Sequence, residues 1–209
     1  MHINDINEIH EKALYYVNTI LRPIVKSTGE PIEGNIFEED PNEKDIFLPK
    51  RKNVIVSCQN KTKALEIGFN SGFSAVLILL SNRDIKLTCV DIGWHSYVIP
   101  CYEQIKKDFG DRIELLVGDS RIVVPTINDS FDLVHIDGGH SEDIAESDIL
   151  HTNKLLMKNA VIIMDDVNMN DDNHVLAKLW KKYIQLYNYK EVSFEIFKND
   201  HNDVREITE

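Results

Sequence analysis

The chain has 209 residues, of which 43% are hydrophobic and 28% are charged, so it can bury the core of one medium-sized domain. Its formal net charge of −12 argues against a protein that binds duplex DNA or long RNA through an extended basic surface. Three widely spaced cysteines without a CxxC pair exclude a disulfide framework and a cysteine-ligated zinc site.

The chain begins with a helical pattern over residues 5–21, which Pro23 is expected to end. Residues 27–45 are rich in glycine, proline and acidic residues, so we expect a surface loop or a flexible cover there. A second helix is expected over roughly 47–59. These elements form an N-terminal helical extension, residues 1–60, that is placed to cover a substrate.

Strands and helices alternate through the rest of the chain, residues 61–209. The expected strands lie at 63–69, 85–93, 112–120, 131–139 and 159–167, and the longer helices between and after them at 73–81, 96–109, 141–157 and 174–187. Each strand is a nearly continuous apolar run, which is typical of a sheet covered by helices on both faces. The tail, residues 189–209, reads as two edge strands joined by a polar turn. The pattern predicts an α/β domain with a doubly wound, mostly parallel, Rossmann-like sheet.

The first strand-to-helix turn, in the segment LEIGFNSGFSA, has an acid and two glycines: Glu66, Gly68 and Gly72. Asn70 and Phe73 stand where a GxGxxG dinucleotide fingerprint needs glycine, and no P-loop is present. The two glycines let the backbone approach a ligand that lacks a pyrophosphate, and the carboxylate can accept from an ammonium group. A plain tight turn before a helix explains the pattern equally well.

Two later strands also end in acids, Asp91 in LTCVDIG and Asp119 in VGDS, where Ser120 follows. Ligands of doubly wound sheets bind at the carboxyl ends of the strands, and an acid at the second strand accepts from ribose hydroxyls. Asp119 is placed to accept from an adenine amino group. The alternative is that each acid is a solvated strand end or a helix cap.

The three strand-end acids and the glycine turn resemble the class I S-adenosylmethionine-dependent methyltransferases over roughly residues 60–190. The resemblance implies a seven-stranded sheet, a cofactor whose methionine part lies on the first turn, its ribose on the second acid and its adenine near the third. The cofactor-binding residues that it implies are Glu66, Gly68, Phe69, Asn70, Ser71, Gly72, Asp91, Ile92, Asp119, Ser120 and Asp137.

The fourth and fifth strands, HIDGGH and VIIMDDVN, resemble the small O-methyltransferases of the catechol and caffeoyl type and related sugar or antibiotic enzymes. That resemblance implies a divalent ion such as Mg²⁺ on Asp137, Asp165 and Asp166, with Asp137 and His140 as catalytic residues and His140 as the base. Histidine at 140 replaces the usual lysine, and Asp166 replaces the usual asparagine. These departures leave open a metal-free mechanism with His140 alone. A helix-capping histidine and solvated strand-end acids are the structural alternatives.

The sequence thus predicts a soluble, cytoplasmic methyltransferase that binds S-adenosylmethionine and methylates a hydroxyl of a phenol or a saccharide. The reduced thiols and the absence of a signal peptide or an apolar span favour that compartment. A homodimer is compatible with the sequence. The alternatives are methylation of nucleic acid or protein, which needs a basic groove, and a non-catalytic cofactor-binding module. A nicotinamide oxidoreductase is disfavoured by the missing fingerprint.

Overall fold

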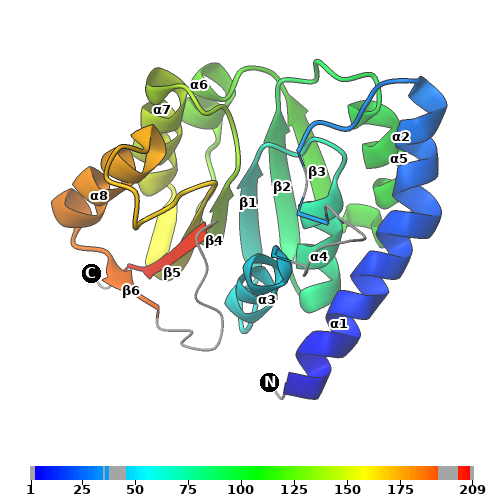
Figure 1. The fold of residues 1–209 in the computed structure, drawn as a ribbon, viewed down its shortest axis with the longest axis horizontal. Helices are drawn as coiled ribbons and strands as arrows, with labels where there is room; N and C mark the ends of the chain where they lie inside the picture. The colour runs from blue at the N-terminus through cyan, green and yellow to red at the C-terminus, as the bar shows by residue number, and fades with distance from the viewer. Residues whose placement is uncertain (1–2, 35, 38–45, 193–201, 208–209) are drawn as a thin grey trace.

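The computed structural model describes residues 3–34, 36–37, 46–192 and 202–207, and a single seven-stranded sheet runs through them (Figure 1). Its strand order is β3-β2-β1-β4-β5-β7-β6, and only the pairings that involve β7 are antiparallel. The strands are β1 (Lys63–Ile67), β2 (Lys86–Asp91), β3 (Ile113–Val117), β4 (Phe131–Ile136), β5 (Leu156–Asp165), β6 (Lys190–Glu191) and β7 (Asn202–Glu206). The predicted mostly parallel, doubly wound sheet is confirmed, and its strand order reverses between β1 and β4.

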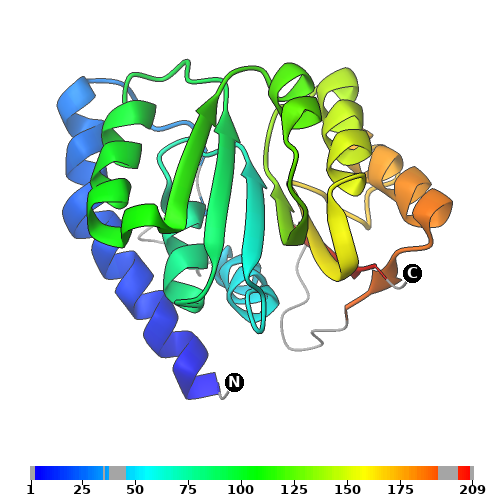
Figure 2. The same ribbon diagram turned by 180° about the vertical axis from the view of Figure 1, so that it is seen from behind.

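Helices cover both faces of the sheet (Figures 1 and 2). One apolar core lies under α1 (Ile3–Tyr16), α2 (Arg22–Thr28), α3 (Leu48–Ser57), α4 (Phe73–Ser81) and α5 (Val98–Phe109). The other lies under α6 (Ser120–Val123), α7 (Glu142–Asn153) and α8 (Val175–Tyr187). Neighbouring strand residues alternate between the two cores, as Ala64 and Leu65 do, because successive side chains of a strand point to opposite faces. This explains the continuous apolar runs.

The first helix does not end before Pro23. A π-helical turn over Val17–Leu21 follows α1, and α2 continues directly from it to Thr28, with Pro23 in its first turn. Proline is tolerated there because its missing N–H is one that the start of a helix leaves unpaired. The π-helical turn connects α1 to the start of α2 at Arg22. Gly29 ends α2 in a left-handed conformation with φ 77°.

Two other predicted elements need correction or completion. The helix expected to reach residue 157 ends at Asn153, and β5 begins at Leu156, because short apolar stretches fit a helix or a strand equally well. The two edge strands of the tail are present as β6 and β7, whereas the polar turn expected between them falls mainly on residues 193–201, which lie outside the described residues.

The loop expected at 27–45 is described only in part. Thr28 still belongs to α2, and the described residues after it, up to Phe37, form neither helix nor strand, but Ile36 and Phe37 are buried in the first core. The three cysteines are buried free thiols, as expected. None of the helices in the described residues is long and apolar enough to cross a membrane.

The turn after β1 packs directly on the end of β4. Gly68 has φ 92°, and a Cβ at this position would lie 1.9 Å from the Asp137 carbonyl oxygen. Asp137 N in turn donates to Ile67 O at 2.8 Å. A side chain at residue 68 would therefore force the two strand ends apart, and glycine is required where the strand order reverses.

We expect Gly68→Ala to lower the free energy of unfolding by about 2–4 kcal/mol, because it adds a backbone clash to a strained φ. Gly29→Ala is the matched control: its φ is also positive, but its Cβ would meet nothing within 4 Å. The control should lose only about 1 kcal/mol. Urea unfolding followed by circular dichroism measures both, and equal losses would contradict the steric argument.

Candidate active site

A cavity of 540 Å³ opens at the carboxyl ends of β1 and β4. Its wall combines the first strand-to-helix turn and the loop after β4 with residues from the N-terminal extension and one residue after β5. The lining residues are Glu33, Gly34, Ile36, Phe47, Lys50, Gly68, Phe69, Asn70, Ser71, Phe73, Ser74, Asp137, Gly138, Gly139, His140 and Asp166. The sheet switch point is where doubly wound folds bind ligands, so this cavity is the candidate site.

The predicted cofactor turn lies on this wall. Gly68 N donates to Val90 O at 2.8 Å, and Asn70 N donates to Asp91 Oδ2 at 2.7 Å. Asp91 Oδ1 accepts from Gly93 N at 2.7 Å, so the acid at the end of β2 organises the first turn as well as its own loop. Each carboxylate oxygen keeps a second lone pair that can accept from a hydroxyl. Ile92 beside it is 42% exposed.

Asp119 and Ser120 lie beyond the cavity wall, at the start of α6. The Asp119 side chain caps this short helix by accepting from Arg121 N at 2.9 Å, and it accepts from the Arg121 guanidinium at 2.6 Å. These hydrogen bonds lower the pKa of Asp119. Arg121 also reaches Asp143 at 2.9 Å. The predicted adenine contact therefore carries an arginine partner that sequence reasoning did not assign to it.

Glu66 does not reach the cavity. Its side chain is fully buried beneath the turn, where Oε2 accepts from Cys89 Sγ at 3.4 Å and Oε1 lies 3.2 Å from His135 Nδ1. The other nitrogen of His135 lies 3.4 Å from Asp165 Oδ2. The predicted contact between Glu66 and a cofactor ammonium group is replaced by this buried contact between Glu66 and His135.

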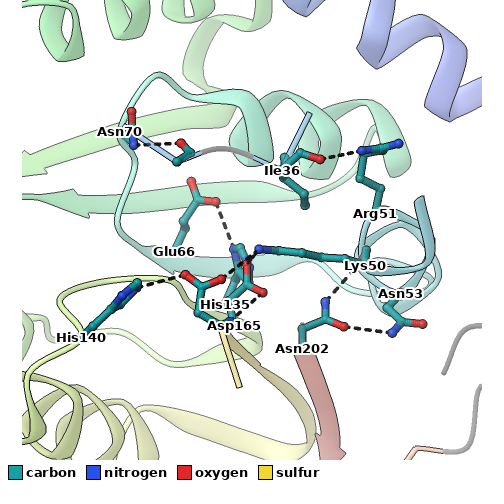
Figure 3. Close-up of polar contacts among 12 residues, drawn as sticks. Ile36, Lys50, Arg51, Asn53, Glu66, Asn70, His135, His140, Asp165 and Asn202 are labelled. Carbon is teal, nitrogen blue, oxygen red and sulfur yellow. Dashed lines mark hydrogen bonds and ion pairs between the residues drawn. The ribbon is translucent and has the colours of Figure 1, made fainter. Parts of the chain in front are cut away.

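Lys50 of α3 extends the buried charges toward the cavity (Figure 3). Its ammonium lies 2.8 Å from Asp165 Oδ2 and 3.5 Å from Asp166 Oδ1, although its side chain is only 6% exposed. Burial alone would lower the pKa of Lys50, but the charges of Asp165, Asp137 and Asp166 raise it above its usual value. The lysine therefore remains charged. Figure 3 shows its side chain running from α3 toward His135 and Asp165.

Besides Glu33 and Lys50, the titratable residues that line the cavity are Asp137, His140 and Asp166. His140 Nε2 lies 3.0 Å from Asp166 Oδ2, and this contact raises the pKa of His140 and helps to lower the pKa of Asp166 to about 2 against the effect of burial. Burial and the charge of Asp165 raise the pKa of Asp137 to about 7. The predicted base and two of the predicted ligands are thus brought together.

The predicted metal ligands Asp137, Asp165 and Asp166 do not form a single ligand set. Among the described residues, the compact donor groups are His135 with Asp137 and Asp165, and Asp137 with His140 and Asp166, each within 4.8 Å. Asp165 is committed to Lys50 and His135. The predicted set does not fit a divalent ion, because an ammonium already lies against one of its carboxylates.

The comparisons with known proteins agree with this geometry. Residues 65–167 match a family model described as a methyltransferase domain. An O-methyltransferase from Aspergillus hancockii is 27% identical over 106 residues, which cover 50% of this chain and 42% of that enzyme. The chain thus spans less than half the length of this curated relative.

Solved structures share the fold over nearly the whole chain. The O-methyltransferase TomG from Streptomyces achromogenes, solved with S-adenosylmethionine, is 16% identical and covers 95% of this chain and 96% of its own, with a TM-score of 0.62. A Podospora anserina methyltransferase bound to S-adenosylhomocysteine is 17% identical over 90% and 88%, with a TM-score of 0.65. A Bacillus cereus O-methyltransferase is 16% identical over 93% and 96%, with a TM-score of 0.62.

The match to the methyltransferase domain model covers residues 65–167 of the 209. The seven-stranded class I fold predicted from the strand-end acids is confirmed. The matched segment supplies the first turn, Asp91 and the β4 and β5 ends, whereas Glu33 and Lys50 on the cavity wall lie before the matched residues.

Sequence reasoning missed Lys50 and His135 in this methyltransferase fold. Lys50 belongs to a short basic run in an expected helix, and nothing local distinguishes it from a solvated lysine. His135 offered a signal: it is a polar residue inside the otherwise apolar end of the fourth strand, FDLVHI. A polar residue at a buried strand position requires a partner, and here its partners are two acids.

Buried His135 should make the stability of this protein depend on pH. Burial alone would lower its pKa, but Asp165 and Glu66 raise it to about 10 from an ordinary 6.5. Its contribution is therefore complete below about 6.5 and is lost as pH rises toward about 10, because the folded state keeps a proton that the unfolded state has released.

We expect the free energy of unfolding to fall by up to about 1.4 kcal/mol per pH unit across this window from this residue alone. His135→Gln removes the titration, so the difference between wild type and variant isolates it. Urea unfolding at several pH values measures this difference. A difference that does not change with pH would show that His135 is neutral in the fold.

Proposed function

We propose that this chain transfers the methyl group of S-adenosylmethionine to a hydroxyl group of a small phenolic or saccharide acceptor. One observation carries the proposal: a single cavity is lined both by the first turn and by His140, Asp137 and Asp166. Methyl transfer needs the sulfonium methyl and the acceptor oxygen in line within one enclosed space. The family match and the solved relatives bound to this cofactor or its product support the same reaction class.

In the proposed reaction, the acceptor oxygen forms a bond to the methyl carbon as the carbon–sulfur bond breaks, and the hydroxyl proton passes to His140. Because Nε2 of His140 faces Asp166, the other ring nitrogen is left to take the proton. Asp166 orients the ring and stabilises the imidazolium that forms. This is the usual pairing of a general base with an orienting acid. The products are the methyl ether and S-adenosylhomocysteine.

The cofactor contacts are assigned within the same proposal. Asp91 binds the ribose hydroxyls, the turn from Gly68 to Gly72 supports the methionine part, and Asp119 with Ser120 contacts adenine. Because Glu66 is buried, Asp137 on the cavity wall is the carboxylate available to the cofactor's ammonium group. The pKa of Asp137, raised to about 7, would fall on binding this cation. A cytoplasmic location and a homodimer stay predictions.

The N-terminal extension takes the role of a substrate cover in this proposal. Asn70 Nδ2 of the first turn donates to Glu33 O at 2.5 Å, which places residues Glu33 and Gly34 against the cofactor side of the cavity. His95 lies 2.7 Å from Glu33 Oε2 and fixes the same segment to the loop after β2. Acceptor choice would then depend on residues outside the matched domain.

Calorimetric titration with S-adenosylhomocysteine tests the cofactor assignment. We expect micromolar-range binding by wild type and a loss of about 10- to 100-fold in Asp91→Ala, since hydrogen bonds from ribose to a charged acceptor are removed. Asp111→Ala is the control, because this acid is fully exposed and pairs only with Lys106 among the described contacts. Absence of binding by wild type would leave a fold without the proposed activity.

The proposed base predicts a shifted pH profile once an acceptor is found by screening phenols and sugars. Asp166 raises the pKa of His140, so kcat/KM should rise with pH through a midpoint above 6.5, where the imidazole loses its proton. Asp166→Asn should move this midpoint to lower pH, and His140→Ala should lower kcat/KM by about 10²- to 10⁴-fold. A profile unchanged by either substitution would exclude His140 as the base.

A further inference from the structure

Lys50 occupies the place where the family resemblance puts a cation. The resemblance implies a divalent ion on acids at the ends of β4 and β5, and the Lys50 ammonium lies 2.8 Å from Asp165 and 3.5 Å from Asp166 at that edge of the sheet. Both Lys50 and Asp166 line the cavity. A single side chain therefore brings positive charge to carboxylates that would otherwise repel one another.

The position of Lys50 is fixed by its surroundings. Asn202 Nδ2 of β7 donates to Lys50 O at 3.4 Å, and Asn53, which lies in α3 with Lys50, donates to Asn202 Oδ1 at 3.0 Å (Figure 3). The next residue, Arg51, donates to Ile36 O at 2.7 Å. These contacts attach α3 to the sheet and to the segment before it, so the ammonium is presented by a fixed helix and not by a solvated arm.

The charges around Lys50 form an alternating series. Glu66 contacts His135, His135 contacts Asp165, Asp165 contacts Lys50, and Lys50 contacts Asp166. Removing a cation from such a buried series leaves an uncompensated acid, which is strongly destabilising in general. Adding a divalent ion beside an ammonium is opposed by the repulsion of like charges over a few ångströms.

We propose that the ammonium group of Lys50 replaces the divalent metal in this protein and holds the acceptor hydroxyl at the cavity wall. Lysine offers three donors, and the cavity position lets one of them face an acceptor oxygen while the others face Asp165 and Asp166. A nearby positive charge favours the deprotonated oxygen, the effect for which related sites would use a metal. The acceptor part of this inference rests on the proposed function.

Metal binding tests the inference without an acceptor or a cofactor. Mn²⁺ is titrated into the full-length protein, and free Mn²⁺ is followed by its electron paramagnetic resonance signal. We expect no binding by wild type up to millimolar Mn²⁺, and no rise in melting temperature on adding Mg²⁺, because nothing binds the folded state. Tight Mn²⁺ binding by wild type that is lost in Asp166→Asn would overturn the proposal, whatever the Lys50 variants do.

Variants of Lys50 make the test specific. Lys50→Met removes the charge, keeps an unbranched side chain and should raise Mn²⁺ affinity by about 10- to 100-fold, the scale of changes around metal ligands. Lys50→Arg keeps a charge and should bind as little as wild type. Lys182→Met is the matched control, because that lysine forms an exposed ion pair with Glu146 away from the site. A folded Lys50→Met without gained affinity would overturn the proposal.

The two proposals fail separately. Suppose that S-adenosylhomocysteine does not bind, that wild type does not bind Mn²⁺ and that Lys50→Met does bind Mn²⁺. The methyltransferase assignment then fails, and the lysine still occupies the cation position. If the cofactor binds and methylation of an identified acceptor is lost in EDTA and restored by Mg²⁺, the lysine proposal fails and the enzyme assignment stands.

Discussion

The site depends on a constraint imposed by burial: charged groups inside the sheet must be paired. Glu66 and His135 are direct neighbours in the register of the parallel strands β1 and β4, so the fold itself places an acid beside a base. His135 then requires Asp165, and Asp165 requires Lys50. Because a lone charge in a dry interior is unstable, each member fixes the next. The series determines which acids are left to face the cavity.

This pairing makes the N-terminal extension contribute a charged group to the site. Besides its apolar contacts, α3 places an ammonium against Asp165 and is tied to Asn202 of β7. The extension therefore supplies a residue of the cavity wall that is paired with a strand-end acid. The first turn follows a similar logic: Gly68 meets the Asp137 backbone, and Asn70 reaches both Asp91 and Glu33.

Much of the fold could be predicted because its signals are local. Apolar runs with strand spacing, the glycine turn and the acids at Asp91 and Asp137 all lie where parallel strands end. The burial of Glu66 was not predicted, because the sequence shows that an acid is near a turn but not to which side it points. Lys50 and Asp165 are 115 residues apart in the chain, and their contact exists only once β5 and α3 pack together. Tertiary contacts of this kind leave no local pattern.

The matched domain and the extension divide the chemistry between them. Residues 65–167 supply the first strand-to-helix turn and the strand-end acids, and carboxylates of this kind are suited to a metal or to an ammonium. The choice is made by what reaches them from outside the domain. In this chain a lysine reaches them, with its ammonium held at 2.8 Å from Asp165. A site of this kind can change its cation without any change in the strand-end motif, because the deciding residue belongs to a different segment. The acids alone therefore cannot identify the cation.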